Sequence, residues 1–270
     1  MSIAVRQVRV SSGVDVPVLV STRMPTGFRH GFTMRAGGTS RAPFDTLNLG
    51  WKWGDAPERI AENHRRLLAA ADATSMFRLS QVHGARIVRV RRDDDPIGLS
   101  LTEGDGLCTD EAGVGLSVHV ADCTPILMAC AATGACAALH AGWRGTAAGM
   151  AYAGVERMRT EFGCEPKDLH VVLGPCIGRC CFEVGPEVAS LFEAAMAGAR
   201  EDGIVAAVPG RKPHVDLRRF QRQQLLAAGV PPDQIDASDA CTVCDPDRRF
   251  FSFRKAGRAT GQSVGFVVRI

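Results

Sequence analysis

The hydrophobic positions of this chain follow two different periods. Alternating or nearly continuous runs rich in β-branched residues predict strands over 5–10, 16–20, 27–34, 85–90, 114–120, 125–130, 135–139, 169–173, 250–254 and 264–270. Apolar positions spaced three and four residues apart predict helices over 57–71, 145–160, 186–198 and 217–228. Asp55 stands where it could cap the first of these helices, and we expect 203–215 to be an exposed connection.

Two neighbouring runs, 125–130 and 135–139, predict a hairpin whose tight turn contains a glycine. If the turn centres on the middle two loop residues, Pro125 faces His140, and Cys123 lies two residues further along its own strand. Facing residues lie about 4.5–5.5 Å apart at Cβ, and diagonal ones about 7–8 Å. A thiol and an imidazole therefore meet at one end of the hairpin, as in a metal site or a Cys-His catalytic pair.

His83 is the candidate third partner, because it stands beside a glycine at the entrance of strand 85–90 and would be exposed enough to ligate a metal. Two histidines and one cysteine are ligands of the type that Zn²⁺ prefers, and three protein ligands leave the open position of a catalytic site. Zinc would hold Cys123 as a thiolate and lower the pKa of a bound water toward about 7. Asp122 could orient an imidazole or accept a proton, or it could be a turn residue bonding its own backbone.

Composition limits the class of protein. With 46% hydrophobic residues among 270, the chain can bury an ample core, and without a linker or repeat it predicts a single domain over 1–270. The net charge of +3 comes from interspersed charges, so no concentrated face for nucleic acid or membrane is expected. The absence of an apolar signal core or a spanning stretch predicts a cytoplasmic protein, whose ten cysteines would stay reduced.

Two arginines are candidates for anion contacts. Arg35 precedes a Gly-Gly loop that could point backbone N–H groups at an anion, although a surface turn would have the same composition. Arg144 stands at the start of the predicted helix 145–160, where it could bind phosphate or stack on Trp143. His119, inside an apolar run, is expected to be a core residue paired to a neighbour.

The remaining cysteines leave several possibilities open. Cys176 and Cys180 have the spacing C-x-x-x-C, which does not match the zinc deaminase signature. Cys241 and Cys244 form a true C-x-x-C, which could be half a zinc ribbon, a redox pair or simple packing. A copper centre is also compatible with two histidines and a cysteine, but multinuclear copper clusters need more imidazoles, and none of the seven histidines forms an H-x-H pair.

A set of short motifs carries a family likeness over nearly the whole chain. In order these are HGFTMRAGG from His30, LNLG from Leu47, GD from Gly54, QVH from Gln81, DG from Asp105, ADCTP from Ala121, HAGWRG from His140 and GPCIG from Gly174. The chain resembles the YfiH/YlmD family, whose members are described as laccase-domain or multicopper polyphenol oxidase proteins, zinc-dependent purine nucleoside phosphorylases and peptidoglycan editing factor. It departs where Lys255 and Gln262 stand in place of the usual arginines.

The resemblance implies an α+β fold, a four-layer α/β/β/α domain with mixed β-sheets, and zinc (alternatively copper) held by His83, Cys123 and His140. It also implies phosphorolysis of adenosine, inosine and methylthioadenosine, with deamination of adenosine. Catalytic roles then fall to Cys123, Asp122 and His140, and substrate contacts to Arg35, Gln81, Trp143 and Arg144. Alternatives are a hydrolase that removes a wrong amino acid from UDP-MurNAc, a polyphenol oxidase, a metal-free thiol enzyme and a zinc-stabilised protein without activity. The expected partner is a small-molecule substrate, and the expected state a monomer.

Overall fold

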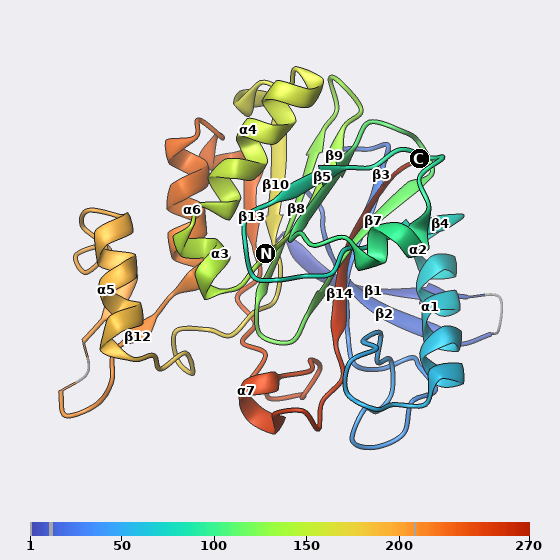
Figure 1. Cartoon of the computed structure of the whole chain (residues 1–270), viewed down its shortest axis with the longest axis horizontal. Helices are drawn as coiled ribbons and strands as arrows, with labels where there is room; N and C mark the ends of the chain where they lie inside the picture. Colours follow the sequence, from blue (N-terminus) through green and yellow to red (C-terminus); the bar gives the residue numbers. More distant parts are fainter. Residues whose placement is uncertain (1, 11–12, 208) are drawn as a thin grey trace.

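Two mixed β-sheets form the centre of the molecule (Figure 1). The computed structural model describes residues 2–10, 13–207 and 209–270, and these contain two six-stranded sheets and one two-stranded sheet. The first sheet has the order β1 (Ile3–Arg9), β2 (Asp15–Ser21), β3 (Phe28–Thr33), β14 (Ser263–Arg269), β7 (Val114–Val120) and β4 (Ser75–Phe77). Its pairs are antiparallel except for β4 and β7.

The second sheet carries the predicted hairpin at its centre. Its order is β13 (Ile235–Ala237), β10 (Leu169–Leu173), β8 (Thr124–Cys130), β9 (Cys136–Ala141), β6 (Gly106–Thr109) and β5 (Ile87–Arg89). Pro125 pairs with His140, so the predicted hairpin register is confirmed. The pairs of β10 with β13 and of β5 with β6 are parallel, and the expected α+β fold with mixed sheets is confirmed.

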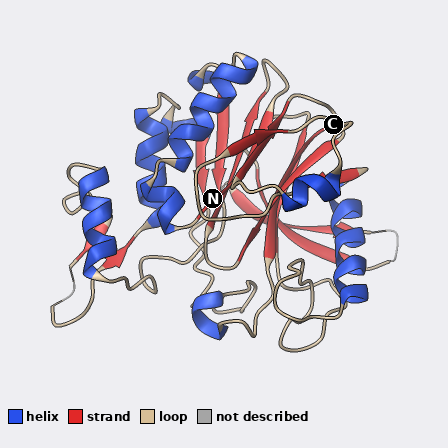
Figure 2. Cartoon of the chain, viewed as in Figure 1, coloured by secondary structure: helices blue, strands red, loops and turns tan. Residues whose placement is uncertain are grey.

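Helices cover the outer faces of the two sheets (Figure 2). The helices are α1 (Pro57–Ala71), α2 (Pro96–Leu101), α3 (Trp143–Ala147), α4 (Met150–Phe162), α5 (Pro186–Ala195), α6 (Leu217–Ala227) and α7 (Phe253–Ala256), with short 3₁₀ turns at Pro166–Asp168 and Pro232–Gln234. Helices α4 and α6 lie on the side of the second sheet, and α1 packs on the first sheet at the opposite side of the molecule (Figure 1). Within the described residues, no helix has both the length and the apolar character needed to cross a bilayer.

One hydrophobic core lies between the inner faces of the two sheets. Phe32 and Leu116 from the first sheet meet Leu127 and Ala138 from the second, and all four are at most 2% exposed. Nearly continuous apolar strands such as Val114–Val120 are buried along their whole length, as expected for strands covered on both faces. This rigid centre fixes the ends of the strands, from which the functional residues project.

Two of the predicted elements are wrong. The helix predicted over 145–160 is two helices, because Gly149 has a φ of 87°, which breaks the helical path between α3 and α4. The strand predicted over 250–254 is instead a loop followed by α7, whose N-cap Ser252 accepts a hydrogen bond from the backbone N–H of Lys255.

Two local predictions also fail. Asp55 does not cap α1, because its carboxylate accepts hydrogen bonds from Ser40 Oγ (2.6 Å) and Asn48 Nδ2 (2.9 Å) and so fixes the preceding loop. The connection 203–215 is not simply exposed: β11 (Val205–Ala206) pairs with β12 (His214–Val215), and their apolar side chains join a small core under α5.

Candidate active site

His83, Cys123 and His140 come together as the sequence predicts. Their ligand atoms all lie within 4.8 Å of one another. His140 is on β9, Cys123 immediately precedes β8, and His83 lies in the loop before β5 with a φ of 63°. The two imidazole rings meet edge to face, with centroids 4.9 Å apart. Three soft or borderline donors therefore converge on one point.

Asp105 holds both histidines in place, although sequence reasoning gave it no role beyond its place in a motif. Its Oδ1 lies 2.8 Å from Nδ1 of His140, and its carboxylate also accepts the backbone N–H groups of His83 (2.9 Å) and Gly84 (2.7 Å). Burial alone would raise the pKa of Asp105, but these hydrogen bonds outweigh it and hold the pKa below its usual value. With Nδ1 of His140 bonded to Asp105, Nε2 is the nitrogen left for a metal.

Cys123 and His140 each favour the charged form of the other, a thiolate beside an imidazolium. Burial alone raises the pKa of the Cys123 thiol, but the charge of His140 and hydrogen bonds from His140 and His83 outweigh burial and lower the pKa to about 6. Burial likewise disfavours the charged imidazole of His140, yet Cys123 and Asp105 raise its pKa to about 9. A thiolate is therefore available near neutral pH, as both metal binding and thiol chemistry require.

Glycines in the HAGWRG motif leave room for the site. A Cβ at Gly142 would lie 2.6 Å from Nδ1 of His83 and 3.1 Å from Sγ of Cys123. A Cβ at Gly145 would lie 2.7 Å from the backbone oxygen of Gly84. A side chain at Gly142 would displace His83 or Cys123, and one at Gly145 would displace the backbone next to His83, so both glycines are needed for the backbone of 142–145 to pass this close to the donors.

Asp122 ties the site to the C-terminal part of the chain. It has a φ of 95°, and its carboxylate accepts hydrogen bonds from Thr242 Oγ1 (2.5 Å) and the backbone N–H of Arg254 (2.6 Å). These bonds span more than a hundred residues of sequence, so the carboxylate does not form a local turn with its own backbone. Asp122 anchors the loop that carries Cys123.

The three donors lie at a pocket of about 380 Å³, a size typical of small-molecule sites. Its aromatic lining consists of Trp51, Trp53, Trp143, Phe182 and Phe253, and its cationic lining of Lys52, Arg78 and Arg254. Most of these residues were missed by sequence reasoning, because many come from the loop 51–53 and the first turn of α7, which only the fold brings to the site. The sequence feature that could have pointed to this wall is the stretch Trp51-Lys52-Trp53, with a tryptophan on either side of a lysine.

The cations of the pocket differ in what they already bind. Arg254 donates from Nη1 to the backbone oxygens of Cys181 (3.2 Å) and Glu183 (3.1 Å). Arg78 takes part in no ion pair among the described residues, and burial lowers the pKa of its guanidinium. Arg78 is therefore a partly desolvated cation that faces the pocket without a fixed anion.

Of the predicted substrate contacts, Gln81 and Trp143 line this pocket and the two arginines do not. The side chain of Gln81 donates a hydrogen bond from Nε2 to the backbone oxygen of His119 and accepts one at Oε1 from the backbone N–H of His119, each at 2.8 Å. Gln81 is therefore fixed as part of the pocket wall. His119 is buried as expected, but its Nε2 has no hydrogen-bond partner among the described residues, and it too lines the pocket.

Arg144 stacks on Trp143, with its Cζ 4.3 Å from the ring centroid. Of the two roles expected for Arg144, phosphate binding or stacking on Trp143, the structure thus shows the stacking. Arg35 bonds Asp45 (2.9 Å) and lies over the ring of Phe251. It lines a separate pocket of about 210 Å³.

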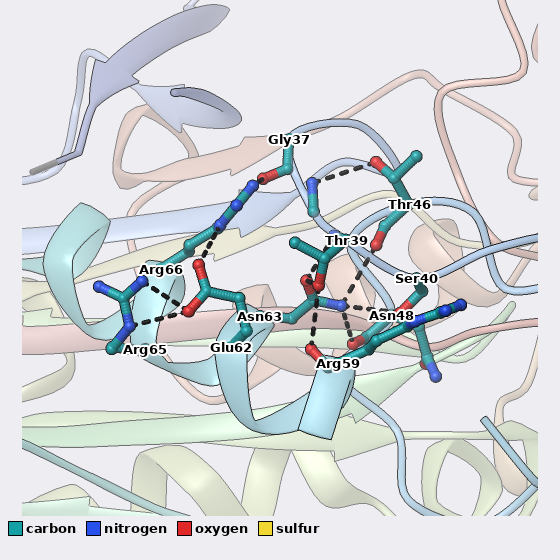
Figure 3. A network of polar contacts seen from close by, with 11 residues as sticks. Gly37, Thr39, Ser40, Thr46, Asn48, Arg59, Glu62, Asn63, Arg65 and Arg66 are labelled. Atoms are coloured by element: carbon teal, nitrogen blue, oxygen red, sulfur yellow. Dashed lines mark hydrogen bonds and ion pairs between the residues drawn. The ribbon is translucent and has the colours of Figure 1, made fainter. Parts of the chain in front are cut away.

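A buried polar network holds the loop that leads to Trp51 (Figure 3). Asn63 of α1 is fully buried and donates from Nδ2 to Ser40 Oγ (2.9 Å) and to the backbone oxygens of Asn48 (2.8 Å) and Thr46 (3.2 Å). Its Oδ1 accepts the backbone N–H of Thr39 (2.9 Å). One side chain thus satisfies several groups of the Gly-Gly loop, which makes this loop a structural support for one wall of the pocket.

The chain is similar to several known proteins. Residues 29–270 match the family model described as multi-copper polyphenol oxidoreductase laccase. Purine nucleoside phosphorylase YlmD of Geobacillus stearothermophilus is 37% identical over 246 residues, which cover 88% of this chain and 89% of that protein. Purine nucleoside phosphorylase LACC1 of Mus musculus is 35% identical over 263 residues, which cover 94% of this chain but only 58% of the mouse protein.

Solved structures show the same fold. The crystal structure of Bacillus licheniformis YfiH superposes with a TM-score of 0.87 at 29% identity, covering 94% of this chain and 96% of that one. YlmD of Geobacillus stearothermophilus superposes with a TM-score of 0.83 at 35% identity, covering 93% and 96%. The likeness therefore extends over almost the whole length of the chain.

Proposed function

Because the chain belongs to the multi-copper polyphenol oxidoreductase laccase family and has relatives named purine nucleoside phosphorylase, we propose that it is a zinc-dependent purine nucleoside phosphorylase. The proposed substrates are adenosine, inosine and methylthioadenosine, with deamination of adenosine as a side activity. The observation that carries the proposal is the convergence of His83, Cys123 and His140 at an aromatic pocket of nucleoside size.

The donor set fits a single zinc ion. Two imidazoles and one thiolate leave a fourth position open, and Asp105 fixes the ring of His140 from behind, as carboxylates commonly do for zinc-bound histidines. Zinc bound there would supply a Lewis acid and lower the pKa of a water. The described residues provide no second histidine-rich group, which supports one ion at the pocket rather than a multinuclear copper cluster.

The pocket offers separate surfaces for the two substrates of phosphorolysis. Trp143 and Phe182, with the tryptophans of 51–53, provide flat apolar surfaces on which a purine can stack. Arg78 and Lys52 face the same space and can balance the charge of phosphate. We assign phosphate to these two residues and not to Arg35, because the guanidinium of Arg35 is engaged by Asp45 outside the pocket.

The proposed catalytic residues are Cys123, His140 and Asp122. Cys123 and His140, together with His83, would hold the metal, and Asp105 would keep the imidazole of His140 in one tautomer. Asp122 faces the pocket with its carboxylate already fixed by two hydrogen bonds, so it can accept a proton without moving. Gln81 and Trp143 shape the wall against which the nucleoside lies.

The test is metal content combined with turnover. The protein purified without added metal is expected to contain zinc, and adenosine is expected to release adenine only when phosphate is present. Cys123→Ala should lose the activity, whereas Cys130→Ala, a core cysteine outside the site, should keep it. Zinc with no phosphate-dependent release would overturn the proposal, as would bound copper with oxygen uptake.

A further inference from the structure

A second group of sulfur atoms lies away from the three donors of the pocket. Four cysteines, two from the loop after β10 and two from the turn after β13, place all their Sγ atoms within 4.8 Å of one another. Because β10 and β13 are parallel neighbours, their carboxyl ends lie at the same edge of the sheet. A bridge between Cys176 and Cys241 continues this pairing beyond the strands. Residues far apart in sequence are thus brought together by the sheet.

Core packing does not explain these thiols. The cysteines that do pack in the core, such as Cys108 and Cys130, are 0% exposed. In the second group only Cys241 is buried, while Cys180 and Cys244 are exposed. All ten cysteines of the described chain are free, so the four are not joined as disulfides. Four sulfurs at this separation, three of them on residues that are exposed or half-buried, are a set that a cation would hold together.

We infer that this group is a second, structural zinc site, separate from the proposed catalytic centre and formed by Cys180, Cys181, Cys241 and Cys244. In a tetrahedral site with Zn–S bonds of about 2.3 Å, neighbouring sulfurs lie about 3.8 Å apart. The observed separations, 3.5 Å between Sγ of Cys180 and Cys244 and none above 4.8 Å, bracket this value. Four thiolates close the coordination shell, as in structural rather than catalytic zinc sites.

The backbone around the group is built for the sulfurs. The backbone N–H of Gly178 donates to Sγ of Cys241 at 3.2 Å, a bond that favours a thiolate. A Cβ at Gly178 would lie 3.2 Å from Sγ of Cys180 and equally close to Cβ of Cys241. Glycine therefore allows the loop of 176–181 to approach the turn of 241–244 closely enough for both pairs of thiols to share one ion.

The site would fix a wall of the pocket. Ile177 and Phe182, on either side of the first cysteine pair, line the pocket. Thr242, inside the C-x-x-C, donates to Asp122, and Arg254 Nη1 donates to the backbone oxygen of Cys181. Joining the two segments through zinc would therefore position side chains at the substrate site without any contact between the ion and the substrate.

The experiment counts zinc in variants that separate the two sites. The wild-type protein, purified with a reducing agent, is expected to hold two equivalents of zinc, one in each donor group. Cys123→Ala should keep one equivalent, and so should Cys180→Ser/Cys244→Ser, while the double control Cys130→Ala/Cys164→Ala should keep two. Loss of the second equivalent should also lower the melting temperature, because zinc that binds only the folded state stabilises it.

Cobalt gives a readout that does not require Cys180→Ser/Cys244→Ser protein to fold. Cobalt added to metal-depleted Cys123→Ala protein should produce the visible and charge-transfer bands of a tetrahedral four-thiolate ion. Cys123→Ala protein that binds neither zinc nor cobalt would overturn the inference. So would Cys180→Ser/Cys244→Ser protein with unchanged zinc, or a disulfide among the four cysteines in the purified protein. Activity plays no part in these measurements, so failure of the proposed phosphorylase function would leave their outcome readable.

Discussion

Nδ1 of His140 and Oδ1 of Asp105 lie 2.8 Å apart, and both side chains are almost completely buried. This contact joins β9 to the residue immediately before β6, and the same carboxylate accepts the backbone N–H of His83. One buried acid therefore orients two of the three proposed metal ligands.

Asp105→Asn is expected to weaken zinc binding by about 10–100-fold, because the amide cannot accept hydrogen bonds at both oxygen positions and the His140 ring loses its fixed tautomer. Competition with a chromophoric chelator measures the affinity. The matched control is Asp110→Asn, which removes a partly exposed ion pair with Arg89 away from the site and should leave zinc affinity unchanged. Equal affinities in the two variants would show that Asp105 has no role in metal binding.

The Cys123 thiol of metal-free protein should react with iodoacetamide well below the pH at which an ordinary thiol reacts. Its pKa is lowered to about 6, so the thiolate fraction rises as the pH passes through about 6 and is complete above it. His140→Gln should move the midpoint to higher pH, because the variant lacks the cation that favours the thiolate. Peptide mass spectrometry after short labelling at each pH distinguishes Cys123 from the other cysteines. An unchanged midpoint in His140→Gln would contradict the proposed ion pair.

Arg78→Ala is expected to raise the KM for phosphate by about 10–100-fold with a smaller effect on the KM for nucleoside, because a hydrogen-bonded charge contributes about 1.5–3 kcal/mol. Steady-state kinetics with each substrate varied in turn measures the split. Arg35→Ala and Arg144→Ala serve as comparisons, since their guanidinium groups contact Asp45 and Trp143. If Arg35→Ala or Arg144→Ala raised the KM for phosphate more than Arg78→Ala does, that arginine would be the phosphate contact, as first predicted from the sequence.

His30 should make the protein less stable in acid. Burial lowers its pKa from 6.5 to about 4, and its Nε2 accepts the backbone N–H of Ser21 at 2.9 Å, which requires a neutral ring. Between pH 6.5 and about 4 the unfolded chain binds the proton more readily than the folded chain. The contribution of His30 to the free energy of unfolding is therefore complete above pH 6.5 and falls by about 3 kcal/mol in total as the pH drops to about 4. Urea unfolding at several pH values should show a steeper acid loss for the wild type than for His30→Gln. Parallel curves would contradict the assignment.

Asn63→Ala should destabilise the fold by about 2–4 kcal/mol, because it leaves buried donors and acceptors of the Gly-Gly loop without partners (Figure 3). Thermal or urea unfolding measures the loss. Asn63→Asp tests the direction of the bonds, since its carboxylate could still accept from Thr39 but could not donate to the backbone oxygen of Asn48. Stability equal to the wild type in Asn63→Ala would show that water replaces the side chain.

Much of this protein could be predicted from local sequence. The hairpin register followed from a short turn, because cross-strand pairing is fixed once the turn is placed, and this located Cys123 near His140. Long periodic segments such as α1 were predicted with their full bounds. The predictions failed at 145–160 and 250–254, where one left-handed glycine and one serine cap outweighed the hydrophobic pattern.

Contacts between residues far apart in the sequence depend on how the strands are ordered in the two sheets. Asp105 reaches His140 because β6 lies beside β9, and Cys180 reaches Cys244 because β10 lies beside β13. A short-range hydrophobic pattern does not predict either strand order, because the order depends on how the two sheets pack against each other. Local sequence was therefore enough to locate the two donors carried on one hairpin, Cys123 and His140. The acid that orients His140, the walls of the pocket and the second sulfur group depend on long-range packing.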